Sequence, residues 1–191
     1  MGRQSVVSDV GTGSVKSALF DESGRLLAST VGSYPPGSER SGEVHPEVWW
    51  NAFRDSINAL ADTHSLARVD RLILSGQMQN LILLGRRDGA AAKEAPSPAF
   101  RNDATGGSDA TGRIDPCGPE TAKARPIAPA ILYFDTRGHA ELERLYAKVD
   151  RERLIAITGN TPDGAGFPGK LLALERSAPE LLERADHLLC G

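Results

Sequence analysis

Three short apolar runs at the start of the chain constrain its fold more than any other feature. They cover residues 4–10, 15–21 and 25–31, and turn-forming residues separate each run from the next. The first turn is rich in Gly, and the second contains Asp, Ser and Gly. Short runs joined in this way are typical of antiparallel strands. The sequence therefore predicts a three-strand antiparallel meander at the N-terminus.

Helical and strand patterns alternate after the meander. A Pro-, Gly- and Ser-rich loop covers 33–43, and a helix starts near Pro46, where the missing proline N–H costs little. Helical spacing predicts a buried stripe of Trp49, Phe53, Ile57 and Leu60. For the pair Trp49 and Trp50, core packing is favoured over ligand stacking. Strands are expected at 69–75, 80–84, 127–134 and 187–190, and helices at 141–148, 151–157, 170–177 and 179–185. This order predicts an α/β fold: a mixed sheet whose meander is followed by alternating helices and strands.

One long segment differs in composition from the rest. Residues 85–125 contain six Gly, four Pro and nine Ala, but only Phe100 and Ile114 as large apolar residues. Such a segment cannot bury enough apolar surface to offset its ordering entropy. We therefore expect a disordered insertion at 85–125, within a single domain covering 1–191.

Composition excludes several classes of protein. The 191 residues include 22 basic and 25 acidic ones, so the net charge of −3 disfavours nucleic acid as a partner. No apolar stretch approaches the ~20 residues that cross a bilayer, and the N-terminus lacks a secretory pattern. Cys117 and Cys190 lie in unrelated contexts, and the four His show no ligand spacing. We expect a cytoplasmic domain without a metal cage.

The strongest chemical signal is the first turn. Asp9 ends a strand, and the turn that follows carries Gly11, Thr12, Gly13 and Ser14, with Lys16 on the returning strand. Glycines let backbone N–H groups approach an anion, and a carboxylate can hold Mg²⁺ directly or through water. The segment fits neither a Walker A loop nor a dinucleotide fingerprint. It predicts a phosphate cradle, with a plain Gly-rich hairpin as the alternative.

Asp9-x-Gly11-Thr12-x-Ser14-x-Lys16 resembles the first phosphate-binding loop of the FGGY carbohydrate kinases, which include xylulokinase-like and ribulokinase-like enzymes. Further matching segments follow in the family's order: Pro46-Glu47-x-Trp49-Trp50, Ser75-Gly76-Gln77-Met78, Ile131-Leu132-Tyr133-Phe134-Asp135-x-Arg137, Ile157-Thr158-Gly159-Asn160, Phe167, Lys170-Leu171-Leu172 and Pro179-Glu180. The resemblance covers essentially the whole chain except the insertion. Because several collinear motifs are more specific than one, the chain is identified as a member of this family.

The resemblance implies a ribonuclease H-like (actin-like ATPase) fold and a kinase that uses ATP and Mg²⁺. Such an enzyme transfers the γ-phosphoryl group of ATP to a hydroxyl of a ketose, pentulose-like, or of a related polyol. By similarity, Asp9 holds Mg²⁺–ATP through water. Gly11, Thr12, Gly13, Ser14 and Lys16 form the phosphate loop, and the substrate pocket is lined by Gln77, Met78, Gln79 and Asp135.

Members of the family have two such domains, with the active site between them. The resemblance implies that residues 1–191 are the N-terminal domain, truncated near its end. The C-terminal domain, with the adenine site and a second phosphate loop, is then absent. The general base is expected beyond Gly191, so no catalytic residue is assigned within the chain. We expect the chain alone to be inactive.

The expected partners follow from the same resemblance. They are the sugar or polyol substrate and the missing C-terminal domain, with a homodimer as a candidate assembly. Neither nucleic acid nor a membrane is expected as a partner.

Several alternatives remain. The chain could be a stand-alone module that binds sugar or nucleotide without turnover, or a nuclease using Asp9 and Asp135, although no third acid is evident. Asp9 could cap a turn, Met78 could fill the core, and Asp135 could pair with Arg137 or cap the helix at Gly138. Gln79 stands where relatives often carry His, so the sequence does not name the sugar.

Overall fold

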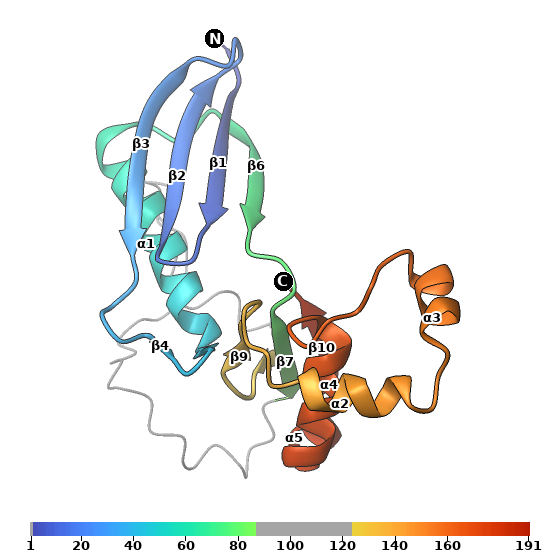
Figure 1. Cartoon of the computed structure of the whole chain (residues 1–191). Helices are drawn as coiled ribbons and strands as arrows, with labels where there is room; N and C mark the ends of the chain where they lie inside the picture. The colour runs from blue at the N-terminus through green and yellow to red at the C-terminus, as the bar shows by residue number, and fades with distance from the viewer. Residues whose placement is uncertain (1, 87–123) are drawn as a thin grey trace. The chain divides into compact units, whose positions relative to one another are not determined.

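The computed structural model describes residues 2–86 and 124–191 (Figure 1). Most of the predicted insertion, residues 87–123, lies outside the described residues. The described residues form two compact units. Unit 1 contains residues 2–38 and 47–77, and unit 2 contains residues 39–46, 78–86 and 124–191.

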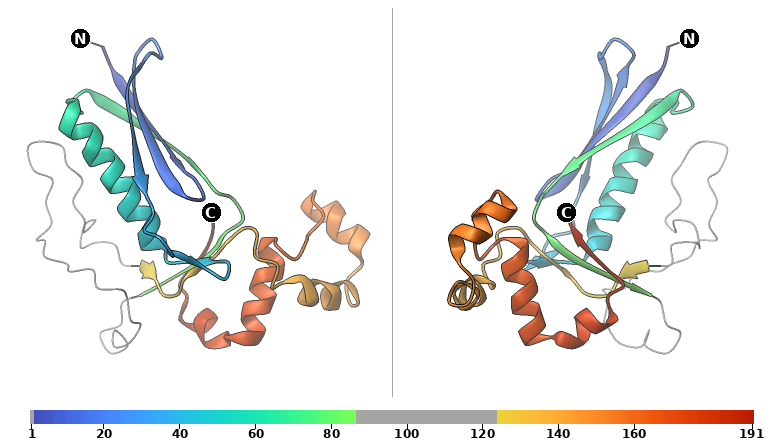
Figure 2. Two further views of the ribbon diagram at one scale, coloured as in Figure 1. Left: turned by 60° about the vertical axis from the view of Figure 1, so that its left-hand side comes forward. Right: turned by 90° about the vertical axis from the view of Figure 1, so that its right-hand side faces the viewer.

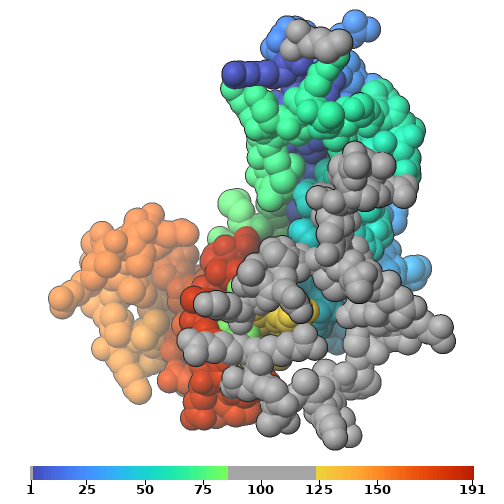
Figure 3. Space-filling model, turned by 180° about the vertical axis from the view of Figure 1, so that it is seen from behind, coloured from blue at the N-terminus to red at the C-terminus, as the bar shows by residue number. Residues whose placement is uncertain are grey.

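Unit 1 is built on a four-stranded sheet with the order β3-β2-β1-β6. The strands β1 (Gln4–Val10), β2 (Ser14–Asp21) and β3 (Leu26–Ser33) pair in antiparallel fashion, which confirms the predicted meander. The strand β6 (Val69–Gly76) pairs in parallel with β1, as a crossover connection requires. The apolar residues Leu72, Ile73 and Leu74 of β6 are at least half exposed. In Figure 3, β6 forms part of the surface that is coloured green.

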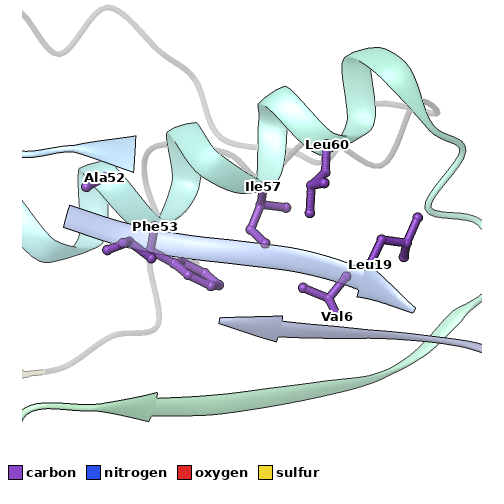
Figure 4. Close-up of a cluster of buried hydrophobic side chains, with 7 residues drawn as sticks. Val6, Leu19, Ala52, Phe53, Ile57 and Leu60 are labelled. Atoms are coloured by element: carbon purple, nitrogen blue, oxygen red, sulfur yellow. The ribbon is translucent and has the colours of Figure 1, made fainter. Parts of the chain in front are cut away.

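The helix α1 (Pro46–Thr63) covers one face of this sheet (Figure 2). Its buried side is formed by Ala52, Phe53, Ser56, Ile57 and Leu60. These side chains meet Val6 and Leu19 from the strands (Figure 4). Each large apolar side chain buried there contributes about 1.5–3 kcal/mol. The predicted stripe is therefore confirmed from Phe53 onward, whereas Trp49 is only half-buried.

A chain of hydroxyl groups crosses the same core. Ser17 bonds Ser8 on β1 and Ser56 on α1, both at 2.7 Å, and the Ser56 hydroxyl lies 2.7 Å from the Phe53 carbonyl oxygen. All three serines are buried. Because each hydroxyl has a partner, the core carries these polar groups without a large desolvation penalty, and they fix β1 and β2 against the helix.

Unit 2 holds a second sheet with the order β10-β7-β9-β5-β4, and β8 also pairs with β7. Its strands are β4 (Glu39–Arg40), β5 (Glu43–Val44), β7 (Leu81–Arg86), β8 (Ala124–Pro126), β9 (Ala130–Ile131) and β10 (His187–Cys190). The strands at 80–84 and 187–190 are thus confirmed, the first with a shift of one or two residues. The prediction of a continuous loop over 33–43 is wrong, since β4 and the first residue of β5 lie in it.

The prediction of one buried strand over 127–134 is also wrong. Within 127–134, all of which the structure describes, β9 alone is a strand. The strand β8 ends just before this range, and Tyr133 and Phe134 are exposed. Pro126 ends β8, and Pro129 immediately precedes β9. Proline has no N–H to donate to a sheet, so Pro129, inside the predicted range, interrupts the strand there.

The four predicted helices of unit 2 are confirmed with small shifts. They are α2 (His139–Tyr146), α3 (Arg151–Thr158), α4 (Phe167–Ser177) and α5 (Pro179–Arg184). Leu174 of α4 joins a core with Leu81, Leu83 and Ile131 of the sheet. In contrast, α3 has no buried residue and projects from the rest of its unit (Figures 1 and 3). Over the described part of the chain, none of the helices has the length and apolarity that a bilayer crossing demands.

Candidate functional site

The predicted phosphate loop is the turn between β1 and β2. It closes through a hydrogen bond from the Gly11 N–H to the Ser14 carbonyl oxygen, at 3.0 Å. A Cβ on Gly11 would lie 3.2 Å from that oxygen, so glycine suits this close turn. Thr12 and Gly13 are exposed, and a Cβ on Gly13 would meet no atom of the described chain within 4 Å. The tip of the turn is therefore backbone that a ligand can approach closely.

Asp9 and Lys16 flank this turn. They lie directly opposite each other in the β1–β2 register, and both are exposed. Their neighbours Ser8 and Ser17 are buried toward α1, so strand alternation places Asp9 and Lys16 on the other face of the sheet. That face, at the end of β1, carries one carboxylate and one ammonium group beside the turn.

The donor set suits a metal ion that arrives with a ligand. Among residues 2–86 and 124–191, no three His, Cys, Asp or Glu side chains gather as a metal-binding group. Mg²⁺ keeps several waters and is usually held by one or two carboxylates together with phosphate oxygens. The single exposed carboxylate of Asp9 fits that arrangement, whereas a resident metal ion would need more ligands.

Two side chains donate hydrogen bonds to the same backbone atom of the turn, the Gly11 carbonyl oxygen. The Gly11 carbonyl oxygen accepts a hydrogen bond from the Tyr34 hydroxyl, at 2.8 Å, and another from Nε2 of Gln77, at 2.7 Å. Burial, with a smaller effect of the Asp9 charge, raises the pKa of Tyr34 to about 12. Sequence reasoning missed Tyr34, because nothing local to its Pro-rich loop connects it to Gly11. It assigned Gln77 to the substrate pocket. The Gln77 amide contacts the predicted phosphate loop, and its role toward the substrate stays a prediction.

A second group of predicted site residues lies in unit 2 around Asp135. The Asp135 carboxylate accepts hydrogen bonds from the Arg137 backbone N–H and Nε, at 2.8 and 2.9 Å, and from its second terminal nitrogen, at 2.8 Å. Arg137 also pairs with Glu43, at 2.7 Å. Burial opposes ionisation of Asp135, but the Arg137 hydrogen bonds and the charges of Arg137 and Lys170 outweigh it and lower its pKa. The pairing alternative for Asp135 is confirmed, while Gly138 begins α2 with no side-chain cap.

Lys170 lies between this carboxylate and the Gln79 backbone. It is fully buried, and its Nζ donates to the Gln79 carbonyl oxygen at 2.8 Å. Burial lowers the pKa of Lys170, although the Asp135 and Asp163 charges oppose this. Gln79 has a φ of +64°, a left-handed backbone conformation that residues other than glycine adopt rarely.

Gly191, beyond which the general base is expected, lies directly after β10. Its N–H donates to the Asn80 carbonyl oxygen, and its own carbonyl oxygen accepts from the Asn80 N–H, both at 3.2 Å. The buried Asn80 side chain in turn accepts a hydrogen bond from the Tyr133 N–H, at 2.8 Å. Gly191 thus continues the β10–β7 pairing through its backbone and has no side chain that could take up a proton. The expected position of the general base after Gly191 stays a prediction.

The structure thus divides the predicted residues into two groups. In unit 1, the predicted phosphate loop lies beside Asp9, Lys16 and the Gln77 amide. In unit 2, the Gln79 carbonyl oxygen accepts a hydrogen bond from Lys170, whose charge also acts on Asp135. Met78 is 76 % exposed, so it does not fill the core. The burial of Lys170 could have been found from sequence, because it precedes the buried Ala173 and Leu174 at helical spacing.

Replacement of Arg137 should make the free energy of unfolding of the chain depend less on pH in the acid range. Arg137→Met is expected to lower the free energy of unfolding at pH 7 by about 2 kcal/mol, because it breaks charged hydrogen bonds to Asp135. The folded-state pKa of Asp135 lies below its ordinary value of 3.8. The contribution is therefore present above that value and is lost as the pH falls through the folded-state pKa.

Urea unfolding at a series of pH values between 7 and 2 measures this effect. The difference between wild type and Arg137→Met should shrink as the pH falls below about 4. Arg153→Met, which removes an exposed arginine of α3, controls for the loss of one positive charge. A difference that stays constant down to pH 2 would contradict the assignment of the stabilisation to the Asp135 carboxylate.

Comparison with known proteins places this architecture in a family. The chain is 37% identical to the xylulose kinase of Bacillus subtilis over 189 residues and 30% identical to that of Escherichia coli over 183 residues. Each alignment covers 95% of this chain but 30% of the relative. The crystal structure of a xylulose kinase from Rhodospirillum rubrum matches with a TM-score of 0.70 and 22% identity, over 99% of this chain and 32% of that one. No family model matches the chain.

These likenesses define an α/β protein with the fold of the actin-like ATPases. The chain is similar to the FGGY carbohydrate kinases, and it matches an N-terminal part of them. It spans about a third of the length of the relatives that it matches.

Proposed function

We propose that this chain is the nucleotide-phosphate-binding part of an ATP-dependent sugar kinase. The observation that carries the proposal is the open β1–β2 turn with Asp9 and Lys16 at its base. The acceptor that we propose is a ketose, of the pentulose class, or a related polyol. The xylulose kinases to which the chain is similar support this class of acceptor.

On the nucleotide side, the residues of the turn would bind the phosphate tail of ATP. The backbone N–H groups of Thr12 and Gly13, with the Ser14 hydroxyl, supply donors, and Lys16 supplies a positive charge. The Gly11 N–H closes the turn by donating to the Ser14 carbonyl oxygen. Asp9 would hold Mg²⁺ through its water shell. When bound, Mg²⁺ neutralises the charge that develops on the transferring phosphoryl group.

On the substrate side, we propose that Met78, Gln79 and Asp135 contact the sugar, with Gln77 immediately before them. A carboxylate has about four acceptor positions, so Asp135 can bind sugar hydroxyls while Arg137 holds it. It is not proposed as the general base. Its lowered pKa makes it a poor proton acceptor at neutral pH, and a base works best with a pKa near the working pH.

The remaining parts of the catalytic site would come from the sequence that the longer relatives have in addition. These parts are the adenine site and the group that removes the proton from the acceptor hydroxyl, which we place after Gly191. A phosphoryl transfer depends on positioning both substrates, so a chain that holds only part of the site should bind ATP weakly. This reasoning also allows the second candidate, a module that binds sugar or nucleotide without turnover.

The purified chain is expected to show little or no kinase activity. Sugar-dependent ADP release, measured with ATP, Mg²⁺ and a panel of pentuloses, should stay below ~1% of the 1–100 s⁻¹ typical of kinases. Asp9→Asn is the matched control, because any true turnover by this chain should disappear with that carboxylate. Turnover at an ordinary kinase rate that Asp9→Asn abolishes would contradict the expectation that the chain is only part of the site.

Titration of the ¹⁵N-labelled chain with Mg²⁺–ATP separates the candidates. Shifts confined to the amides of Gly11–Lys16, and reduced in Asp9→Asn, would support phosphate binding by the turn. Shifts only with a pentulose, at Gln79 and Asp135, would favour a sugar-binding module. A chain that responds to neither ligand at millimolar concentration would contradict both candidates.

A further inference from the structure

The phosphate loop is held by two side chains that converge on one backbone atom. The Gly11 carbonyl oxygen has two lone pairs, and the Tyr34 hydroxyl and Gln77 Nε2 use both, at 2.8 and 2.7 Å. These donors lie 23 and 66 residues from Gly11 in the sequence. Tyr34 follows β3, and Gln77 follows β6, so the donors reach the turn from opposite sides of the sheet order.

Backbone hydrogen bonds support the same arrangement. The Gln77 N–H donates to the Val10 carbonyl oxygen at 3.2 Å, and the Tyr34 N–H donates to that of Gly13 at 3.5 Å. Gly76, just before Gln77, approaches Val10 so closely that an added Cβ would lie 3.1 Å from its carbonyl oxygen. Both ends of the loop are thus anchored to the segments that carry the two side-chain donors.

Fixing the Gly11 carbonyl has a consequence for the ligand side of the loop. In a planar trans peptide, the C=O and the following N–H point in opposite directions. The Gly11 carbonyl points toward Tyr34 and Gln77, so the Thr12 N–H of the same peptide points away from them. Thr12 is exposed. This N–H therefore has a set direction at the open side of the turn, where an anion would approach.

We infer that Tyr34 and Gln77 are positioning residues of the phosphate loop, acting together as a clamp on the Gly11 carbonyl oxygen. The inference deepens the proposed nucleotide-binding function and rests on it. Neither residue touches the phosphate. Their effect is to hold the Gly11–Thr12 peptide in the orientation that binds an anion, so that this orientation need not be selected on binding.

The chemistry of each donor suits such a clamp. The Tyr34 ring packs against the core of unit 1, while its hydroxyl is used by Gly11. Its pKa of about 12 keeps the hydroxyl protonated, and so a donor, at every physiological pH. The Gln77 side-chain amide does not titrate, so its nitrogen remains a hydrogen-bond donor at every physiological pH. The clamp is therefore constant across pH, unlike one built from a carboxylate or a histidine.

The clamp is tested with Tyr34→Phe, which keeps the ring and removes the hydroxyl, and with Gln77→Met, which keeps the length and removes the donor. Tyr146→Phe is the matched control, because Tyr146 also donates to a backbone carbonyl at 2.8 Å, that of Pro162 in unit 2. Hydrogen exchange of the Thr12, Gly13 and Ser14 amides should become about three- to tenfold faster in each clamp variant, as expected for one lost hydrogen bond. It should not change in Tyr146→Phe.

Nucleotide affinity provides the second readout. The Kd for Mg²⁺–ATP, from titration of the labelled chain, should rise about three- to tenfold in Tyr34→Phe and in Gln77→Met, and further in the double variant. Two results would overturn the inference. One is faster exchange spread evenly over β1, β2 and α1, which indicates a purely structural role. The other is a locally faster turn with unchanged affinity.

Failure of the proposed function would look different. If the wild type does not bind Mg²⁺–ATP, the nucleotide proposal is wrong whatever the variants do. Locally faster exchange in Tyr34→Phe and Gln77→Met, absent from Tyr146→Phe, would then still confirm that both side chains hold the Gly11 peptide. Exchange at the turn equal to that of Tyr146→Phe would contradict the clamp itself.

Discussion

Gly13→Val is expected to weaken Mg²⁺–ATP binding at least about tenfold without destabilising the fold. A Cβ at this position meets no atom of the described chain within 4 Å, and the backbone φ is not left-handed. Replacement of glycine at such a site usually leaves stability unchanged or raises it by about 0.4–1 kcal/mol. The valine side chain would instead occupy the space through which a phosphate reaches the backbone N–H groups. Titration with Mg²⁺–ATP and urea unfolding of the same sample measure both effects.

Gly32 provides the opposite case and serves as the control. A Cβ on Gly32 would lie 1.9 Å from the Ala52 carbonyl oxygen of α1. Gly32→Ala should therefore destabilise the chain by about 3 kcal/mol or more, because β3 and α1 would have to separate. If Gly13→Val destabilised the chain as strongly as Gly32→Ala, or bound Mg²⁺–ATP as wild type does, the open turn would not be an anion site.

Removal of the buried Lys170 ammonium group is expected to have the largest effect on the stability of unit 2. Lys170 is fully buried, and its Nζ is 2.8 Å from the Gln79 carbonyl oxygen. Lys170→Ala should lower the free energy of unfolding by about 3–5 kcal/mol, since it leaves a cavity and an unmatched carbonyl. Lys170→Met fills most of the volume, so it should cost only about 1–3 kcal/mol, the desolvation penalty of the unpaired group.

Urea unfolding of the three proteins at pH 7 gives this ranking. Lys148→Met, at an exposed lysine just after α2, is the control and should lie within about 0.5 kcal/mol of wild type. A Lys170→Met chain that equals or exceeds the stability of wild type would contradict the prediction. It would mean that the cost of burying the ammonium group cancels its bond to Gln79, as occurs for some buried charges.

Much of the fold could be predicted because its signals are local. The meander was predicted from turn residues, and Asp21 does bridge the second turn, accepting hydrogen bonds from the N–H groups of Ser23 and Arg25. The stripe on α1 followed from helical spacing. The errors have equally definite causes. Pro129 interrupts the strand predicted at 127–134, and β4 and β5 are too short for a periodic pattern.

The candidate site was predictable only in part. Asp9, the glycines of the turn and Lys16 are close in the sequence, so a local pattern was enough to predict that they lie together in the fold. Tyr34 and Lys170 act through single hydrogen bonds to Gly11 and Gln79. No composition or spacing near Tyr34 indicates such a bond. Lys170 lies 91 residues from its partner.

The sequence by itself determined the meander, the buried stripe of α1 and most of the later helices, because backbone propensity, helical spacing and turn chemistry act over a few residues. Only the tertiary structure decided what the polar groups outside the β1–β2 turn contact. The Gln77 amide meets Gly11 because β6 lies beside β1 in parallel register, and that pairing joins residues 66 positions apart. Such contacts depend on the packing of the whole sheet, which no local pattern encodes.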